Sequence, residues 1–131
     1  MRIFKNKWFT RYARRENIND ALICQDVAQI NPGVADADLG GGVIKQRIAR
    51  PGDGKSGGFW VIILFKVDGL AFFVYGFAKS ERGNIAANEL KAFRKLALTM
   101  MNLDSKALEQ ANIEGALLEI ACEVIQNEEA V

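Results

Sequence analysis

Two apolar stretches separated by a short turn limit most strongly what this chain can fold into. Residues 59–65 are apolar without a break, and residues 70–77 are nearly as apolar. Asp68 and Gly69 lie between the two stretches, and an Asp-Gly pair favours a tight hairpin between antiparallel strands. A strand that is apolar on both faces is usually covered on both faces. The sequence therefore predicts a central strand over residues 59–66, paired with a strand over residues 70–77.

A strand over residues 43–49 precedes this hairpin and completes an antiparallel meander. Side chains alternate along a strand, so Lys45 and Arg47 are expected on one face and Ile44 and Ile48 on the other. The same alternation in strand 70–77 assigns Phe73, Tyr75 and Phe77 to one face, and Leu70, Phe72 and Val74 to the other.

Helical patterns flank the meander on both sides. Residues 5–16 carry apolar side chains at helical spacing with basic residues between them, which predicts a basic amphipathic helix with its aromatic stripe in the core. Asn17 and Asn19 are good N-cap residues for a second helix over residues 21–29, which Pro32 and Gly33 end. Residues 1–4 predict a short edge strand. Helices over residues 86–102 and 105–112 and a strand over residues 117–123 complete an α+β fold: two N-terminal helices, an antiparallel meander sheet of three or more strands, C-terminal helices and a final strand.

Charge is distributed unevenly along what we expect to be one domain over residues 1–131. Residues 1–103 contain 16 basic and nine acidic residues, a net charge of +7. The acidic C-terminal segment 104–131 contains one lysine and seven acidic residues, a net charge of −6. A basic body predicts a polyanionic partner, and the acidic segment raises the question of whether it covers that basic surface.

The composition excludes several kinds of site. The sequence has no histidine, so the usual zinc sites and an imidazole general base are excluded. The apolar runs are too short to cross a bilayer, and the N-terminus lacks the pattern of a signal peptide. Cys24 and Cys122 are expected to be buried free thiols in a reducing cytoplasm, with a disulfide as the alternative.

Four cations in residues 43–60 are the main candidates for a functional site. These are Lys45, Arg47, Arg50 and Lys55, with Asp53 as the one acidic residue among them. A row of cations beside a Gly-rich loop suits a polyanion, and the alternative is a solvated strand face. The glycines at 40–42 and the sequence Gly54-Lys55-Ser56 lack the spacing of a nucleotide-binding loop.

Three motifs resemble the RelE/HigB-type toxins of bacterial type II toxin–antitoxin systems, within the RelE/ParE superfamily. They are the basic run at 45–59 (KQRIARPGDGKSGGF), the run at 72–85 (FFVYGFAKSERGNI) and the ending at 108–120 (LEQANIEGALLEI). Together they span most of the chain in the order expected for a toxin of this kind.

The resemblance implies a cytoplasmic bacterial toxin that cleaves messenger RNA, usually on the ribosome, and that a cognate antitoxin silences; it implies no cofactor and no metal. The RNA supplies its own 2′-hydroxyl nucleophile, so cations can do most of the work of positioning and charge stabilisation. The resemblance makes Lys45 and Lys55 candidate bases or phosphate contacts. Arg47 and Arg50 are candidate phosphate ligands, and Tyr75, Lys79 and Arg82 contribute from the neighbouring strand. Arg82 and Glu81 have the alternative role of a simple surface pair.

The chain departs from this family at Trp60, where many relatives have arginine. Trp60 either removes a charge from the site, stacks on a nucleobase of bound RNA, or is buried in the sheet. Tyr75 either stacks on a base or acts as an acid, or it is a core tyrosine with a satisfied hydroxyl.

Two other functions remain open for this fold. One is a ParE-like toxin that poisons DNA gyrase, although such a toxin has no need of converging cations. The other is a non-catalytic domain that binds RNA or an antitoxin. The sequence leaves the oligomeric state open.

Overall fold

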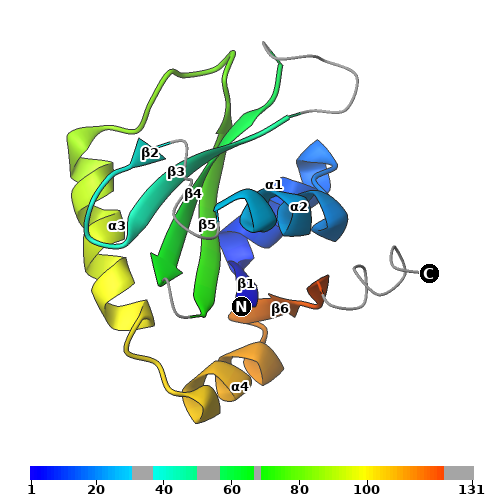
Figure 1. The fold of residues 1–131 in the computed structure, drawn as a ribbon, viewed down its shortest axis with the longest axis vertical. Helices are drawn as coiled ribbons and strands as arrows, with labels where there is room; N and C mark the ends of the chain where they lie inside the picture. The colour runs from blue at the N-terminus through cyan, green and yellow to red at the C-terminus, as the bar shows by residue number, and fades with distance from the viewer. Residues whose placement is uncertain (31–36, 50–56, 67–68, 123–131) are drawn as a thin grey trace.

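The computed structural model describes residues 1–30, 37–49, 57–66 and 69–122. Within these ranges the chain forms four helices and one six-stranded sheet, an α+β fold (Figure 1). In chain order the elements are β1 (Arg2–Asn6), α1 (Lys7–Glu16), α2 (Asp20–Ile30), β2 (Ala37–Asp38), β3 (Val43–Ile48), β4 (Phe59–Lys66), β5 (Leu70–Ala78), α3 (Ala87–Met100), α4 (Ser105–Glu114) and β6 (Leu117–Ile120).

The strands lie in the order β2-β3-β4-β5-β1-β6. The meander β3-β4-β5 is antiparallel throughout, as predicted, and β4 has the predicted bounds. The whole sheet is nevertheless mixed, because β1 pairs with β5 in parallel and with β6 antiparallel.

The prediction of an edge strand over residues 1–4 is wrong, and so is the inference that two helices precede the sheet. β1 lies inside the sheet between β5 and β6, and its Ile3 and Phe4 are 3% and 0% exposed. The segment is too short for its pattern to distinguish an edge strand from a central one. Its position inside the sheet results from its long-range pairing with β5, the last strand of the meander.

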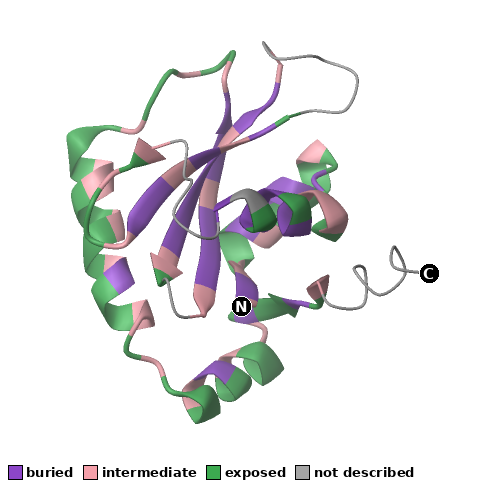
Figure 2. Cartoon of the chain, viewed as in Figure 1, coloured by how far each residue is buried: buried purple, intermediate pink, exposed green. Residues whose placement is uncertain are grey.

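Helices cover both faces of the sheet and make three layers. In Figure 1, α1 and α2 lie on one side and α3 on the other. One core packs α1 and α2 against Phe59, Ile63 and Phe73 of the sheet. The other packs α3 and α4 against the opposite face, where Ile62, Leu64 and Phe72 are buried. The buried residues accordingly concentrate in β4 and β5 (Figure 2).

Asparagine and aspartate side chains fix the helix ends. Asn19 caps α2 as predicted, because its Oδ1 accepts from the backbone N–H of Leu22 at 2.9 Å. Asn17 does not cap α2; it ends α1 in the left-handed conformation (φ 59°), which asparagine tolerates better than most residues. Asn6 caps α1 and Asp104 caps α4 through backbone N–H groups three residues later, at 2.8 Å in both cases.

The glycines at 40–42 serve the turn between β2 and β3. All three have positive φ values, a conformation that glycine adopts without strain. A Cβ on Gly41 would lie 3.0 Å from the Arg94 side chain of α3, whose guanidinium donates to the Leu39 carbonyl. The triplet therefore allows this turn to pack on α3.

The structure also contradicts the expectation of free thiols. Cys24 of α2 and Cys122, which follows β6, form a disulfide with a Cα–Cα distance of 5.6 Å. The two cysteines are 98 positions apart, and local sequence patterns do not reveal that the fold brings them together. No helix in the described ranges is long and apolar enough to span a membrane.

Candidate functional site

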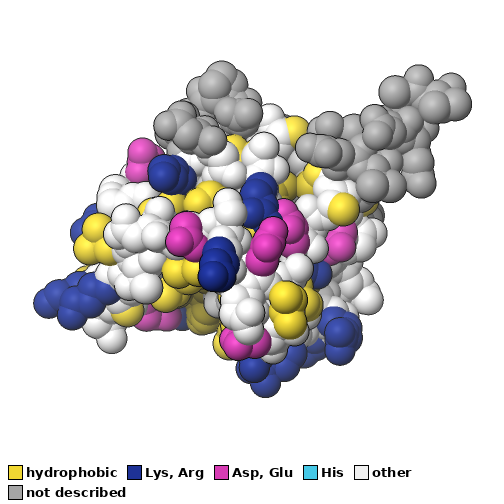
Figure 3. All heavy atoms as spheres, turned by 90° about the horizontal axis from the view of Figure 1, so that it is seen from below, with side chains coloured by type: hydrophobic (Ala, Val, Ile, Leu, Met, Phe, Trp, Pro, Cys, Tyr) yellow, Lys and Arg dark blue, Asp and Glu magenta, His cyan; other side chains and the backbone are white. Residues whose placement is uncertain are grey.

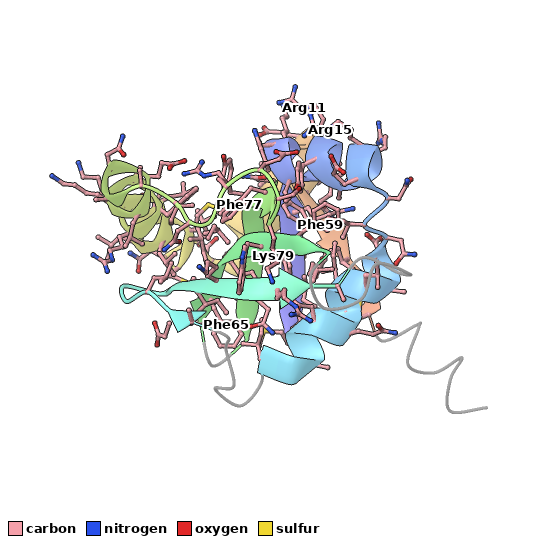
Figure 4. The ribbon with its side chains drawn as sticks, turned by 90° about the horizontal axis from the view of Figure 1, so that it is seen from above. Arg11, Arg15, Phe59, Phe65, Phe77 and Lys79 are labelled. Atoms are coloured by element: carbon pink, nitrogen blue, oxygen red, sulfur yellow. A yellow bond between two sulfur atoms is a disulfide. The ribbon has the colours of Figure 1, made fainter. Side chains whose placement is uncertain are left out.

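The candidate residues lie at the end of the sheet where β5 finishes and β4 begins. Figure 4 looks onto this end from above: Lys79 lies near the middle of the view, with α3 on one side of the sheet and α1 and α2 on the other. The backbone N–H of Lys79 donates to the Gly58 carbonyl at 3.2 Å, which joins the two segments just outside the strands. The opposite end of the molecule carries basic and acidic side chains interspersed (Figure 3).

Trp60 holds two lysines beside the sheet. The Nζ atom of Lys45 lies 4.3 Å from a Trp60 ring centroid, and that of Lys79 lies 5.6 Å away. Both distances are within the range in which an ammonium is attracted to the face of an indole. Trp60 is half-buried and pairs with Arg47 of β3 and Phe77 of β5. Trp60 thus contacts one lysine from β3 and one from the connection after β5.

Arg82 connects Lys45 to Tyr75 of β5 and to α3. The Nζ atom of Lys45 donates to Oδ1 of Asn84 at 3.3 Å, and Nε of Arg82 donates to the Asn84 carbonyl at 2.9 Å. A second guanidinium nitrogen of Arg82 donates to the hydroxyl of Tyr75 at 3.2 Å. These contacts join Lys45, Asn84, Arg82 and Tyr75 in one hydrogen-bonded chain.

Glu89 is the acidic partner of Arg82. Its two carboxylate oxygens accept from the guanidinium at 2.5 and 3.2 Å, a bidentate geometry that is strong and directional. The hydrogen bond from Arg82 and then the backbone N–H of Ala86 lower the pKa of Glu89, and Glu89 in turn raises the pKa of Arg82. The pairing of Arg82 with Glu81, an alternative suggested by their adjacency, is replaced by this pair with α3.

A β-bulge determines where Tyr75 points. Ile62 pairs with Tyr75 and Ile63 with Phe73, which leaves Val74 as the extra residue. The predicted grouping of Phe73 with Tyr75 is therefore wrong: Phe73 packs in the core beneath α1 and α2, whereas Tyr75 packs against the core of α3. The Tyr75 ring lies 4.5 Å from Trp8 and 5.7 Å from Phe93, measured between ring centroids.

Arg47 pairs with Trp60 across β3 and β4, and it lines a cavity of about 530 Å³ together with Trp60 and Lys79. Arg50 and Lys55 lie outside the described residues. The structure thus brings Lys45, Trp60, Tyr75, Lys79 and Arg82 into one connected group, and it joins Arg47 to this group through Trp60. We call Lys45, Trp60, Tyr75, Lys79, Arg82 and Asn84 the strand-end cluster.

Three residues in or beside the strand-end cluster were not predicted from the sequence. Asn84 belongs to the motif at 72–85, but the motif assigns it no role in the site. The helical pattern predicts Trp8 in the core, whereas it is 37% exposed. Glu89 stands three residues after Ala86, a spacing at which a glutamate commonly reaches back to the start of a helix. Its Oε1 accepts from the Ala86 N–H at 2.7 Å, so this spacing was the available signal.

Comparison with known proteins places this geometry in context. A family model described as the RelE toxin of the RelE/RelB toxin–antitoxin system matches residues 1–120. No curated protein matches the chain.

Proposed function

The chain belongs to the RelE family of toxins of toxin–antitoxin systems, and on that premise we propose that it is a metal-independent endoribonuclease that cleaves messenger RNA in the bacterial cytoplasm. Its substrate is mRNA on the ribosome. Membership of this family also implies a cognate antitoxin as partner.

The observation that carries the proposal is the gathering of three cations around Trp60 and Asn84. Lys45 comes from β3, whereas Lys79 and Arg82 come from the connection after β5. Cations held in this way stabilise the negative charge that develops on the phosphoryl oxygens as the 2′-hydroxyl attacks, without rearranging during the reaction. Lys45 and Lys79 are the proposed phosphate contacts in the cluster, with Arg47 beside them.

Tyr75 is the proposed acid. Its hydroxyl accepts a hydrogen bond from Arg82, which leaves the hydroxyl proton free to be donated to another group. In the proposed reaction the 2′-oxygen bonds to phosphorus and releases its proton to a water molecule, and the Tyr75 proton goes to the leaving 5′-oxygen as the bond between phosphorus and that oxygen breaks. Because Glu89 holds Arg82 at two points, we assign Arg82 the role of positioning Tyr75.

One observation favours a second candidate, a non-catalytic domain of the same fold that binds RNA. Glu89 offsets the charge of Arg82, and Trp60 stands where the resemblance to this family implies an arginine. Such a domain would bind RNA with strong salt dependence and would leave it intact.

The test is induction of the protein in bacteria, with primer extension on a reporter transcript. Wild type is expected to arrest growth and to create new RNA ends, whereas a Lys45→Ala/Arg47→Ala variant should do neither. For Lys45→Ala alone we expect cleavage to fall by about 10²–10³-fold, the usual cost of removing one charge-stabilising contact. Lys91→Ala, an exposed lysine on α3, is the matched control and should cleave like wild type. Growth arrest without new RNA ends contradicts the nuclease proposal and favours a gyrase-poisoning or RNA-binding toxin.

A further inference from the structure

The cavity beside the strand-end cluster has a second wall that the proposed reaction does not use. It has a volume of about 530 Å³, within the range of pockets that hold small molecules. One wall is formed by the sheet, at the end of β3, the start of β4 and the end of β5. Helix α2 forms the other wall. Its lining residues are Leu22, Gln25, Asp26, Arg47, Ile48, Ala49, Trp60 and Lys79.

The two walls differ in charge. Arg47 and Lys79 are cations on the sheet side. Helix α2 contains neither lysine nor arginine, and it contributes the apolar side chain of Leu22, the carboxamide of Gln25 and the buried carboxylate of Asp26 to the cavity. A phosphate is therefore attracted to the sheet side, whereas a group that carries hydrogen-bond donors, such as a nucleobase with an amino group, fits against α2.

The α2 wall is held in a fixed position. Ile23 and Val27 of the helix are buried in the core between α2 and the sheet, at 0% and 5% exposure. Positions 22, 25 and 26 lie on a common helical face, since residues three and four apart are neighbours on a helix. Asn19 caps the helix, and the disulfide ties Cys24 to Cys122, two residues after the end of β6. Gln25 itself is exposed, so its carboxamide is accessible to a ligand.

From this arrangement we infer that the cavity is a subsite for one nucleotide of the RNA next to the cleaved bond, with Gln25 as the residue that reads its base. The nucleotide's phosphate lies against Arg47 and Lys79. Its base lies between Trp60 and α2, where Leu22 and Ile48 supply apolar contacts. The Gln25 carboxamide offers a donor and an acceptor to the edge of the base, the means by which proteins commonly distinguish unpaired bases. The inference rests on the proposed function, because it takes RNA as the substrate.

The test uses Trp60 as an internal reporter. The chain contains two tryptophans, so a Trp8→Phe background leaves Trp60 as the sole source of indole fluorescence. Phenylalanine keeps a ring against Tyr75, and circular dichroism checks that the variant folds. Each of the four ribonucleoside 5′-monophosphates is titrated into this protein, with ribose 5-phosphate as the ligand that lacks a base.

We expect saturable quenching by the nucleotides, with different affinities for the four bases and weaker binding of ribose 5-phosphate. Gln25→Ala in the same background should weaken the preferred nucleotide by roughly three- to tenfold, the usual effect of one lost hydrogen bond, and should narrow the spread among the bases. Gln110→Ala on α4, remote from the cavity, is the control and should leave all four affinities as they were.

Three results overturn the inference: no saturable change in Trp60 fluorescence, equal binding of ribose 5-phosphate and the nucleotides, or an unchanged order of affinities in Gln25→Ala. Since binding is measured without cleavage, the outcome is separate from that of the proposed function. Base-dependent binding by a protein that cuts no RNA would retain the subsite and reject the nuclease. RNA cleavage without a change in Trp60 fluorescence would retain the nuclease and reject the subsite.

Discussion

Val74 determines which face of the sheet carries Tyr75, although Val74 itself has no functional group. As the extra residue of a bulge, it moves Tyr75 from the face of Phe73 to the face of the cations. The sequence identified Lys45, Lys79, Arg82 and Tyr75 as candidates through their motifs. It could not assign Tyr75 to a face, because simple alternation assumes regular pairing and a one-residue bulge reverses every side chain that follows.

Tyr75→Phe tests whether the hydroxyl of this tyrosine takes part in the reaction. The ring contacts with Trp8 and Phe93 remain in the variant, so the fold should be retained. Loss of the proton donor should lower the cleavage rate by about 10²-fold or more, the usual contribution of a general acid. Single-turnover cleavage of mRNA on purified ribosomes measures the effect. A rate equal to that of wild type would assign Tyr75 a packing role only.

At the scale of elements, the helices, the meander and the final strand followed from the sequence, while the position of β1 did not. The local patterns that predict an element hold no information about which distant strand it pairs with. Gly76 illustrates the difference. A Cβ at this position would lie 2.8 Å from Cε2 and 3.2 Å from Cδ2 of Tyr12, so the glycine lets α1 approach β5 closely. The sequence alone shows that Gly76 is a glycine within a predicted strand, but it does not show that a helix packs against this position.

Gly76→Ala is therefore expected to force α1 away from the sheet. The added methyl group overpacks a well-filled core, and such changes typically cost about 1–3 kcal/mol. Urea unfolding of the variant beside wild type gives the difference in the free energy of unfolding. Gly83→Ala is the control, because a Cβ there meets no atom within 4 Å. Equal stability of the two variants would contradict the close approach.

The edge strand β6 is joined to β1 by an ion pair that should respond to pH. Arg2 donates to both carboxylate oxygens of Glu119, at 2.9 and 3.0 Å. This hydrogen bonding lowers the pKa of Glu119 below its ordinary value of 4.5. A carboxylate with a lowered folded-state pKa stabilises the protein above its unfolded-state pKa. That contribution is lost as the pH falls through the folded-state value.

Glu119→Gln should accordingly reduce stability at pH 7 and have progressively less effect as the pH falls below 4.5. The pair is about one-third exposed, so the loss at pH 7 should be at most about 1 kcal/mol. Thermal unfolding at pH 7 and pH 3 measures both values. Glu81→Gln, at an exposed position, is the control and should show no such pH dependence. If Glu119→Gln lowered the stability by the same amount at pH 7 and at pH 3, the result would contradict the ion pair between Arg2 and Glu119.

At the scale of the whole molecule, the acidic segment and the disulfide are the features that the sequence left unresolved. The described part of segment 104–131 does not lie across the strand-end cluster: α4 packs on the core that also contains α3, and β6 lies beside β1. The contact between Cys24 and Cys122 depends on the complete strand order. Spacing in the sequence cannot reveal such a contact.

Reduction of the disulfide should lower the free energy of unfolding by about 2–5 kcal/mol, because it releases a closed loop that spans 98 positions. Urea unfolding with and without dithiothreitol measures the change. Cys122→Ser should have the lower stability in both conditions and should not respond to the reductant. Since disulfides are rare in reducing compartments, thiol trapping in freshly lysed cells reports which form is present in vivo. A wild-type stability that does not respond to the reductant would contradict a closed disulfide.

The disulfide between Cys24 of α2 and Cys122 also alters how the molecule can be unfolded by force. A protease that unfolds proteins by pulling on the carboxyl end would meet the crosslink at Cys122 before it had extracted any strand of this sheet. Further pulling would draw two segments into the translocation pore at once and would load α2 directly. Resistance to such degradation would then depend on whether this one covalent bond is intact.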